Sequence, residues 1–234
     1  MSWQDRLDRP RATHRHMMPA VAYPLRSLRC DGADPPYNLT SGRFEAFELL
    51  PMTMYTRQGD DGTTGLRGGE RVPKDDVRIA ACGELDEVNA VLGWAGAACS
   101  EDDTVQALRQ IQWDLLNLGA ELAAVTAPEP RVNIDENVRR LEQWIDEVTA
   151  ELEPLKGFIL PGGGGVAARF QVARTVCRRA ERAVVRLSRE HGVRGAVLAY
   201  VNRLSDLLFV LARRANARAG VAEVHWDGAA RPNP

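Results

Sequence analysis

The sequence VAARFQVARTVCRRAERAVVRLSREHGVRGAVLAYVNRLSDLLFVLARRANARA, at residues 166–219, contains two long helical patterns joined by the short break His191-Gly192. Apolar residues recur every three or four positions on both sides of the break, which is typical of helices with one buried face. We expect helices over about 166–190 and 194–219. Because a short loop makes consecutive helices antiparallel neighbours, this pair predicts an up-and-down helical bundle.

The same periodicity occurs in the preceding hundred residues. Helices are predicted over about 75–98 and 102–125, and a further one, ending near residue 152, begins with Asn133 or Asp135 as its cap. There is no convincing strand pattern and no apparent internal repeat. The sequence therefore predicts an all-α fold, an up-and-down bundle of five helices.

Bulk properties limit the classes of function. The chain has 234 residues, 44% of them hydrophobic, which is enough for one good core and does not demand two domains. Its formal net charge is -2, so it lacks the basic field that nonspecific nucleic-acid binding requires. No apolar run approaches the length of a membrane span. We expect neither a nucleic-acid partner nor a membrane partner.

Cysteine and histidine patterns argue against a protein-held metal. The four cysteines form no CxxC pair, and the four histidines form no HExxH motif. Three of the cysteines lie within helical patterns, where a small apolar side chain suits the core. We expect a reducing, cytoplasmic location and no metal-ligating residue. The cysteines are Cys30, Cys82, Cys99 and Cys177.

The first residues differ in composition from the rest of the chain. Residues 1–52 hold six of the thirteen prolines and show no sustained periodicity, so we expect a disordered N-terminal extension. The abrupt change suggests the hypothesis that the native chain starts at Met52 or Met54. The bundle domain is expected over 53–220, and residues 221–234 are expected to form a C-terminal tail.

A glycine-rich run, YTRQGDDGTTGLRGGERVPK at residues 55–74, precedes the first predicted helix. Glycines let backbone N–H groups turn toward an anion, threonines add hydroxyl donors, and Arg57 and Lys74 supply positive charge, so a polyphosphate is the natural ligand. The P-loop spelling GxxxxGK[ST] is absent. The alternative is that Asp60-Asp61-Gly62 forms only a turn.

The helix predicted over 166–190 has two different faces. Three arginines and one glutamate share a narrow sector, because successive helical residues rotate by about 100°. Apolar residues occupy the opposite side. The charged sector is either a solvated face laced by ion pairs or a cationic groove for phosphates, and the glycine-rich run favours the groove. Its members are Arg174, Arg178, Glu181 and Arg182; the apolar side comprises Ala173, Val176, Cys177, Ala180, Val184 and Leu187.

Two other helices carry polar residues outside their core stripes. The helix over 75–98 offers Asp86 and Asn89 on one side, where Asp86 could hold one of the arginines. On the last helix, Asn202 shares a sector with Asp206, Phe209 and Arg213. Asn202 could orient a nucleotide hydroxyl or phosphate, or it could be an ordinary surface amide.

Five motifs occur in order along the chain: TRQGDDGTTG at 56–65, GELDEVN at 83–89, FILPGG at 158–163, ARTVCRRAER at 173–182 and VNRLSD at 201–206. Together they closely resemble the PduO-type ATP:cob(I)alamin adenosyltransferases. The resemblance covers about residues 54–220. Departures are modest: Gln58 replaces a usual small residue, and Phe170-Gln171 stands where Leu-His is common.

The resemblance implies a five-helix bundle that forms a homotrimer and binds ATP between neighbouring subunits, with Mg²⁺ on the triphosphate. It implies that the N-terminal loop wraps the triphosphate and that the arginine helix and the last helix complete the nucleotide site. The loop residues carried over are Thr56, Arg57, Gly59, Thr64, Gly65 and Lys74. The helix residues carried over are Arg178, Arg179, Glu181, Arg182 and Asn202, of which Arg179 lies off the charged sector.

The resemblance also implies the corrin side of the site. Asp86 and Arg174 match an intersubunit ion pair, and Phe158 matches the phenylalanine that packs against the corrin and displaces its lower axial base. The implied reaction is attack of cob(I)alamin on C5′ of ATP, giving adenosylcobalamin and triphosphate. Lys74, Arg178 and Arg182 would neutralise the leaving group, and Phe158 would act on the corrin.

Two alternatives stay open at the level of sequence. One is a non-catalytic carrier bundle that binds cobalamin or ATP without turnover. The other is an unrelated helical scaffold whose arginine face binds a protein partner, which predicts no stabilisation by ATP. If the chain is a transferase, an electron-donating reductase and an adenosylcobalamin-dependent mutase are candidate partners.

Overall fold

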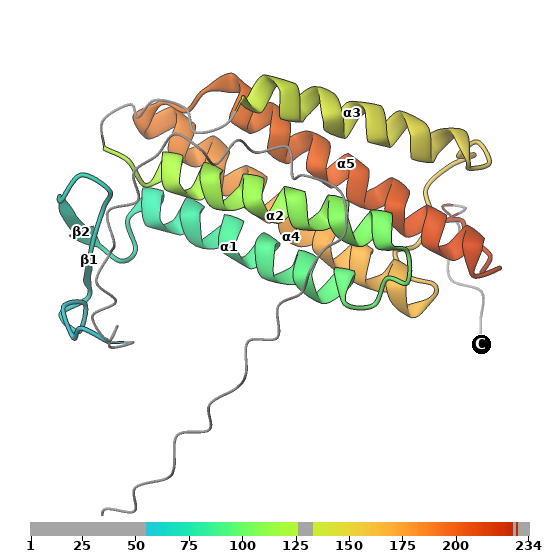
Figure 1. Ribbon diagram of the computed structural model, residues 1–234, viewed down its shortest axis with the longest axis horizontal. Helices are drawn as coiled ribbons and strands as arrows, with labels where there is room; N and C mark the ends of the chain where they lie inside the picture. Colours follow the sequence, from blue (N-terminus) through green and yellow to red (C-terminus); the bar gives the residue numbers. More distant parts are fainter. Residues whose placement is uncertain (1–54, 126–132, 227, 229–234) are drawn as a thin grey trace, which may run out of the picture. The chain divides into compact units, whose positions relative to one another are not determined.

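The computed structural model describes residues 55–125, 133–226 and 228. The predicted extension over 1–52 and the proposed start at Met52 or Met54 lie outside the described residues. The described chain forms five α-helices and one two-stranded sheet (Figure 1). The elements in chain order are β1 (Thr63–Gly65), β2 (Arg71–Pro73), α1 (Val77–Gly96), α2 (Asp102–Leu122), α3 (Ile134–Ala150), α4 (Gly165–His191) and α5 (Gly195–Arg218).

The helix ends follow the local chemistry of the sequence. Asp76 caps α1, because its carboxylate accepts a hydrogen bond from the Arg78 N–H at 2.8 Å. Asn133 caps α3 in the same way, which decides between the two predicted caps. At the end of α4, Gly192 has a φ of 72°, a conformation that glycine adopts without steric cost. The predicted break between the last two helices is confirmed.

The helices pack in a chain of neighbours: α1 against α2 and α4, α4 against α5, and α5 against α3 (Figure 1). The predicted apolar stripes of α4 and α5 are buried in full. In α1 and α2 most apolar residues at helical spacing are also buried, whereas Ile79 and Val105 remain half-exposed. The buried ones are Leu85, Val88, Leu92, Leu108, Ile111, Leu115, Leu118 and Leu122. The all-α five-helix prediction is confirmed, and the apolar periodicity is its physical cause.

A polar group lies inside this apolar core. The Asp114 carboxylate on α2 is buried, accepts a hydrogen bond from the Tyr200 hydroxyl at 2.9 Å and pairs with Arg140 of α3 at 2.6 Å. Burial, and then the adjacent Asp114 charge, raise the pKa of Tyr200 well above its ordinary value. This cluster ties α2, α3 and α5 together where their apolar faces meet.

The small sheet corrects the expectation of no strands. β1 and β2 pair antiparallel, with Thr64 opposite Val72. Each strand has only three residues, too few to show a period-two pattern in a run rich in glycine and threonine. The hairpin is attached to the end of α2, because the Arg67 N–H donates to the Ala123 carbonyl at 3.0 Å.

The expectation that no apolar run approaches a membrane span also needs a correction. α5 is long and apolar enough to cross a membrane by length and composition. In the described structure, 56% of its most apolar stretch is buried against the other helices. Its apolar character is that of the helix at the centre of the bundle.

Candidate functional site

The charged face of α4 is the densest cluster of candidate residues. Arg178 Nη1 lies 2.7 Å from Glu181 Oε2, an ion pair between consecutive turns of the helix. Arg182 Nη1 donates to the Arg178 carbonyl at 2.9 Å, which turns its guanidinium back along the same face. Arg178 and Arg182 are exposed, and Glu181 is half-buried between them. The face thus presents two accessible guanidiniums beside a carboxylate, as the sequence predicted.

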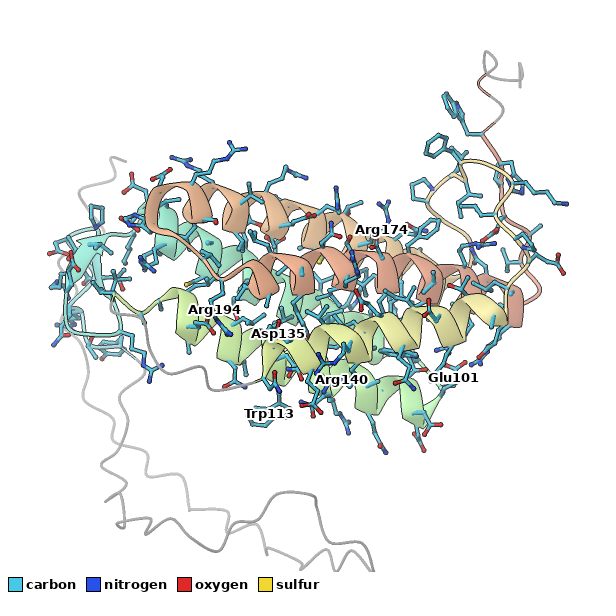
Figure 2. All side chains as sticks on the ribbon, turned by 90° about the horizontal axis from the view of Figure 1, so that it is seen from above. Glu101, Trp113, Asp135, Arg140, Arg174 and Arg194 are labelled. Atoms are coloured by element: carbon cyan, nitrogen blue, oxygen red, sulfur yellow. The ribbon has the colours of Figure 1, made fainter. Side chains whose placement is uncertain are left out.

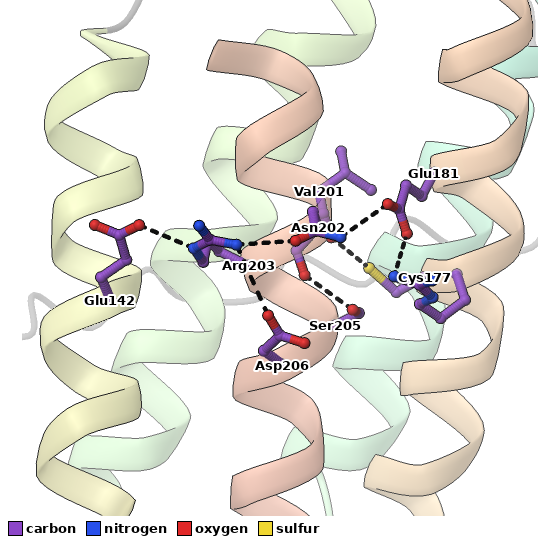
Figure 3. A network of polar contacts seen from close by, with 9 residues as sticks. Glu142, Cys177, Glu181, Val201, Asn202, Arg203, Ser205 and Asp206 are labelled. Carbon is purple, nitrogen blue, oxygen red and sulfur yellow. Dashed lines mark hydrogen bonds and ion pairs between the residues drawn. The ribbon is translucent and has the colours of Figure 1, made fainter. Parts of the chain in front are cut away.

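Asn202 brings α5 into the same cluster. Its Nδ2 donates to Glu181 Oε1 at 2.9 Å (Figure 3). Asn202 is therefore not an isolated surface amide, although the sequence left that interpretation open. Beneath it the Cys177 thiol is buried, and this burial raises its pKa far above the ordinary value, so the thiol is not a nucleophile.

Arg179 occupies a different position from the other arginines of α4. It donates to Glu84 at 2.7 Å and also pairs with Glu87, both on α1. These hydrogen bonds raise the pKa of Arg179 further above its ordinary value. The structure thus places Arg179 in an ion-paired contact between α1 and α4. It lies apart from Arg178, Glu181 and Asn202, although the resemblance predicted that all four residues contact the nucleotide.

The glycine-rich run is folded around Asp61 and Lys74. The Asp61 carboxylate accepts from the Thr63 N–H at 2.9 Å and from its hydroxyl at 2.8 Å, and these bonds lower the pKa of Asp61. A turn is therefore present at Asp60-Asp61-Gly62, as the alternative interpretation of this run proposed. A Cβ added to Gly59 would lie 3.0 Å from Lys74 Nζ, so the ammonium group lies directly over this glycine. Gly59 and Lys74, two predicted ATP residues, are brought together.

The remaining predicted loop residues lie on the outside of this run. Arg57 has a φ of 60°, a left-handed conformation that is uncommon for a residue with a Cβ and is often retained at binding sites. Its guanidinium lies over the Tyr55 ring, 5.5 Å from the centroid. Thr56, Arg57 and Gly65 are exposed and Thr64 is half-exposed, so all four are accessible to a ligand.

Phe158 lies on a loop that is held by the end of α5. The ring is 75% exposed, and among described residues its aromatic neighbour is Trp226, edge-on at 6.0 Å between centroids. Asn216 of α5 accepts from the Gly164 N–H at 2.9 Å and donates to the Gly162 carbonyl at 3.1 Å. Phe158 is therefore presented to solvent by an ordered loop.

The segment over 221–226 is hydrogen-bonded to this loop, whereas the sequence placed it in a tail outside the bundle domain. The Leu160 N–H donates to the Val224 carbonyl and the Trp226 N–H donates to the Phe158 carbonyl, both at 2.8 Å. Glu223 accepts from the buried guanidinium of Arg213 at 2.8 Å. The backbone partners of this segment lie more than 60 residues earlier in the chain, so no local pattern in the sequence points to the pairing.

Replacing Gly163 with alanine is expected to destabilise the Phe158 loop. Gly163 has a φ of 105°, and an added Cβ would collide with the Asn216 amide, which both neighbouring peptides hold in place. We expect a loss of about 1–3 kcal/mol, seen as faster hydrogen exchange at the Gly164 amide. Gly165→Ala is the matched control, because a Cβ there meets open space. Equal protection in the two variants would contradict this account of the loop.

The glycine-rich run and the Phe158 loop lie at opposite ends of the bundle (Figures 1 and 2). The run leads into the start of α1, and the Phe158 loop leads into the start of α4, a 27-residue helix that spans about 40 Å. One chain therefore does not bring Lys74 and Phe158 into the same site. A site that uses both must be built from more than one chain.

Asp86 and Arg174 do not form an ion pair with each other within the described chain. Asp86 is exposed, and no ion pair joins it to another described residue. Arg174 Nε donates to the buried Gln171 amide oxygen at 2.8 Å, and no ion pair joins Arg174 to a carboxylate of another described residue. Asn89 does not share the Asp86 surface, because it exchanges hydrogen bonds with Gln112 of α2.

Sequence reasoning missed residues that act through contacts between helices. Arg203 and Glu142 extend the Asn202 cluster toward α3, while Arg213 and Asn216 hold the Phe158 loop. The periodicity of α5 does mark Arg213 and Asn216 as polar residues on a largely buried helix. Their partners before α4, the Glu153 and Gly162 carbonyls, are 60 and 54 residues away, and no local signal identifies them.

Within the described ranges, no three His, Cys, Asp or Glu side chains form a group that could hold a metal ion. A hard cation such as Mg²⁺ needs few protein ligands when phosphate oxygens and water supply the rest. A Mg²⁺ ion carried by a nucleotide would therefore need at most one or two carboxylates, and Glu181 is a half-buried carboxylate beside Arg178 and Arg182.

Comparisons with known proteins agree on one family. A model described as cobalamin adenosyltransferase matches residues 54–215. A corrinoid adenosyltransferase of Bacillus subtilis (strain 168) is 43% identical over 183 residues, 76% of this chain and 94% of that protein. A corrinoid adenosyltransferase of Mycobacterium tuberculosis (strain ATCC 25618 / H37Rv) is 46% identical over 171 residues, 70% of this chain and 88% of that protein.

A solved structure shows the same fold. It is a phenylalanine-to-alanine variant of a PduO-type ATP:corrinoid adenosyltransferase from Lactobacillus reuteri, complexed with cobalamin and ATP. The two chains are 34% identical, with a TM-score of 0.72 over 75% of this chain and 99% of that chain.

Proposed function

Because this chain belongs to the cobalamin adenosyltransferase family, we propose that it transfers the 5′-deoxyadenosyl group of ATP to cob(I)alamin. The products are adenosylcobalamin and triphosphate. The comparisons with known proteins confirm the family that the five motifs indicated, and they confirm the assignment to a transferase.

The observation that carries the proposal is the cluster of Arg178, Glu181 and Asn202 on α4 and α5. It offers charge and hydrogen bonds but no activated nucleophile, and the nearby Cys177 thiol is buried. Cob(I)alamin is itself the nucleophile. Its cobalt donates an electron pair to C5′, the cobalt–carbon bond forms, the C5′–oxygen bond breaks, and triphosphate leaves with that electron pair.

The protein's task is to align the reactants and to stabilise charge on the leaving group. We assign the triphosphate to Lys74, Arg178 and Arg182, whose positive groups are accessible or lie over glycine backbone. Bound Mg²⁺ would supply further positive charge to the phosphates. Glu181 and Asn202 would orient the nucleoside. Loop residues with accessible backbone or hydroxyl donors would wrap the phosphates; they are Thr56, Arg57, Gly59, Thr64 and Gly65.

Phe158 is assigned to the corrin. Its exposed ring projects from an ordered loop, which suits packing against a large apolar ring. Removing the lower axial base makes Co(II) easier to reduce to Co(I). Phe158 would therefore act on the reduction step and not on the transfer of the adenosyl group.

We propose a homotrimer with sites between subunits. The separation of the glycine-rich run from the Phe158 loop within one chain supports this arrangement, as do the accessible Asp86 and Arg174 side chains. We place the reaction in the cytoplasm, because the described cysteines are free thiols. A reductase would supply the electrons, and a mutase that uses adenosylcobalamin would consume the product.

Asp86→Ala and Arg174→Ala are expected to have similar, non-additive effects. Each change removes one partner of the proposed intersubunit ion pair, so the second change has little left to remove. Size-exclusion chromatography with light scattering would report the trimer, and turnover would report the corrin site. Fully additive losses in the double variant would contradict the pairing.

An anaerobic assay with chemically reduced cob(I)alamin, ATP and Mg²⁺ tests the function directly. We expect the spectral change to light-sensitive adenosylcobalamin and one triphosphate per product. If the protein binds ATP and corrin but forms neither product, it is a non-catalytic carrier. If ATP gives no thermal stabilisation, the arginine face belongs to a scaffold that binds another partner.

A further inference from the structure

A continuous series of polar contacts joins α3, α5 and α4 and includes the cluster of Arg178, Glu181 and Asn202 (Figure 3). Arg203 Nε on α5 donates to Glu142 Oε1 on α3 at 2.9 Å. The same guanidinium donates through Nη1 to Asn202 Oδ1, also at 2.9 Å. Asn202 Nδ2 in turn donates to Glu181 Oε1, and Glu181 pairs with Arg178. Arg203 therefore links α3 to the candidate site through its hydrogen bond to Asn202.

These contacts determine which way the Asn202 amide points. Its oxygen accepts from a guanidinium and its nitrogen donates to a carboxylate, so both ends have a charged partner of the right kind. A flipped amide would set oxygen against the Glu181 carboxylate and N–H groups against Arg203. Hydrogen bonds to charged groups are among the stronger ones, so the flip is disfavoured at both ends.

Arg203 is itself held in place. Glu142 fixes its Nε, and the Asp206 carboxylate lies 3.9 Å from Nη1. Partial burial raises the pKa of Asp206, and the nearby Arg203 and Arg178 charges act in the opposite direction. The Arg203 side chain is about 39% exposed, so the guanidinium is held more by its hydrogen bonds to Glu142 and Asn202 than by burial.

We propose that Arg203 is a positioning residue for ATP: it orients the Asn202 amide and thereby keeps Glu181 shared between Asn202 and Arg178. Without Arg203, the Asn202 oxygen loses its donor and the amide is free to rotate away from Glu181. Glu181 then pairs with Arg178 alone, which withdraws positive charge from the triphosphate. This role rests on the proposed function, because it assigns Arg178 and Asn202 to the nucleotide.

Arg203→Met tests the role, because methionine keeps an unbranched apolar stem and removes every donor. We expect the Kd and the KM for ATP to rise about tenfold, the cost of one hydrogen bond to a charged group, with a smaller change in kcat. Arg203→Lys should recover part of the loss, since it keeps the charge and can satisfy one acceptor. Arg186→Met is the matched control; it removes an exposed ion pair with Glu190 on α4 and should change neither constant.

A double-mutant cycle distinguishes positioning from general stability. If Arg203 acts through Asn202, adding Arg203→Met to Asn202→Ala should cost almost nothing further in ATP affinity. Additive losses, or a Kd for ATP in Arg203→Met equal to that of the native protein, would overturn the proposal. Calorimetric ATP binding gives this result even if the native protein forms no adenosylcobalamin, so a failure of the proposed function is seen separately. Circular dichroism identifies a variant that does not fold, and Arg203→Lys then decides the question.

Discussion

Replacing Arg178 with methionine is expected to lower kcat for cob(I)alamin and ATP by about 100- to 1,000-fold, the range found when one preorganised donor to a developing charge is removed. Arg178 is accessible on α4, and Glu181 holds its guanidinium in place at 2.7 Å. Charge on the triphosphate grows as the C5′–oxygen bond breaks, so the interaction is strongest in the transition state. Stopped-flow absorbance under anaerobic conditions measures the rate directly.

Two comparisons make the Arg178 result specific. Arg186→Met removes an arginine just over two turns further along α4, outside the cluster, and should retain the native rate. Arg178→Lys keeps the charge but loses the planar pair of donors, and should lie between methionine and the native protein. A large rise in the KM for ATP with an unchanged kcat would contradict the role assigned to Arg178, because it would mean that ATP and the transition state are bound equally.

Replacing Phe158 with alanine is expected to slow product formation from cob(II)alamin by about 100-fold, or about 2.7 kcal/mol. This lies within the roughly 1.5–3 kcal/mol that burial of a large apolar side chain contributes. ATP affinity should remain native, since Phe158 is assigned to the corrin and the triphosphate is assigned to Lys74, Arg178 and Arg182. Turnover with a reducing system, followed by absorbance, reports the first quantity and calorimetry reports the second.

Leu160→Ala is the control for Phe158, because this side chain is exposed on the same loop and its backbone makes the same kind of strand contact. It should leave ATP binding and turnover from cob(II)alamin unchanged. With chemically prepared cob(I)alamin, Phe158→Ala should also turn over at close to the native rate. A deficit with cob(I)alamin as large as that with cob(II)alamin would place Phe158 in the transfer step and contradict the assignment to reduction.

Helix positions and the buried faces could be predicted from the chain alone. The apolar stripes of α4 and α5 recur at helical spacing and are buried as expected, because periodicity and burial have the same physical cause. The charged sector of α4 follows from the same geometry, since Arg178, Glu181 and Arg182 lie within about one turn. Local rules also limited the cap of α3 to Asn133 or Asp135, of which the structure uses Asn133, and identified the glycine that ends α4.

The contacts between distant segments could not be predicted in this way. The sequence placed residues 221–226 in a tail, but they pair with the loop of Phe158, and hydrogen bonds between backbone groups leave no pattern in the side chains. The three-residue strands β1 and β2 escaped notice for a similar reason. Arg179 matched a nucleotide motif, yet its guanidinium lies against Glu84 and Glu87 of α1, which only the packing of two helices reveals.

The sequence by itself thus determined the number of helices, their buried faces and the residue types available for an anion, because these depend on spacing within a single helix or loop. Tertiary structure alone decided that Asn202 is held between Glu181 and Arg203, and that the glycine-rich run and the Phe158 loop lie at opposite ends of the bundle. Those facts depend on how helices far apart in the chain pack against one another. Local spacing carries no information about that packing.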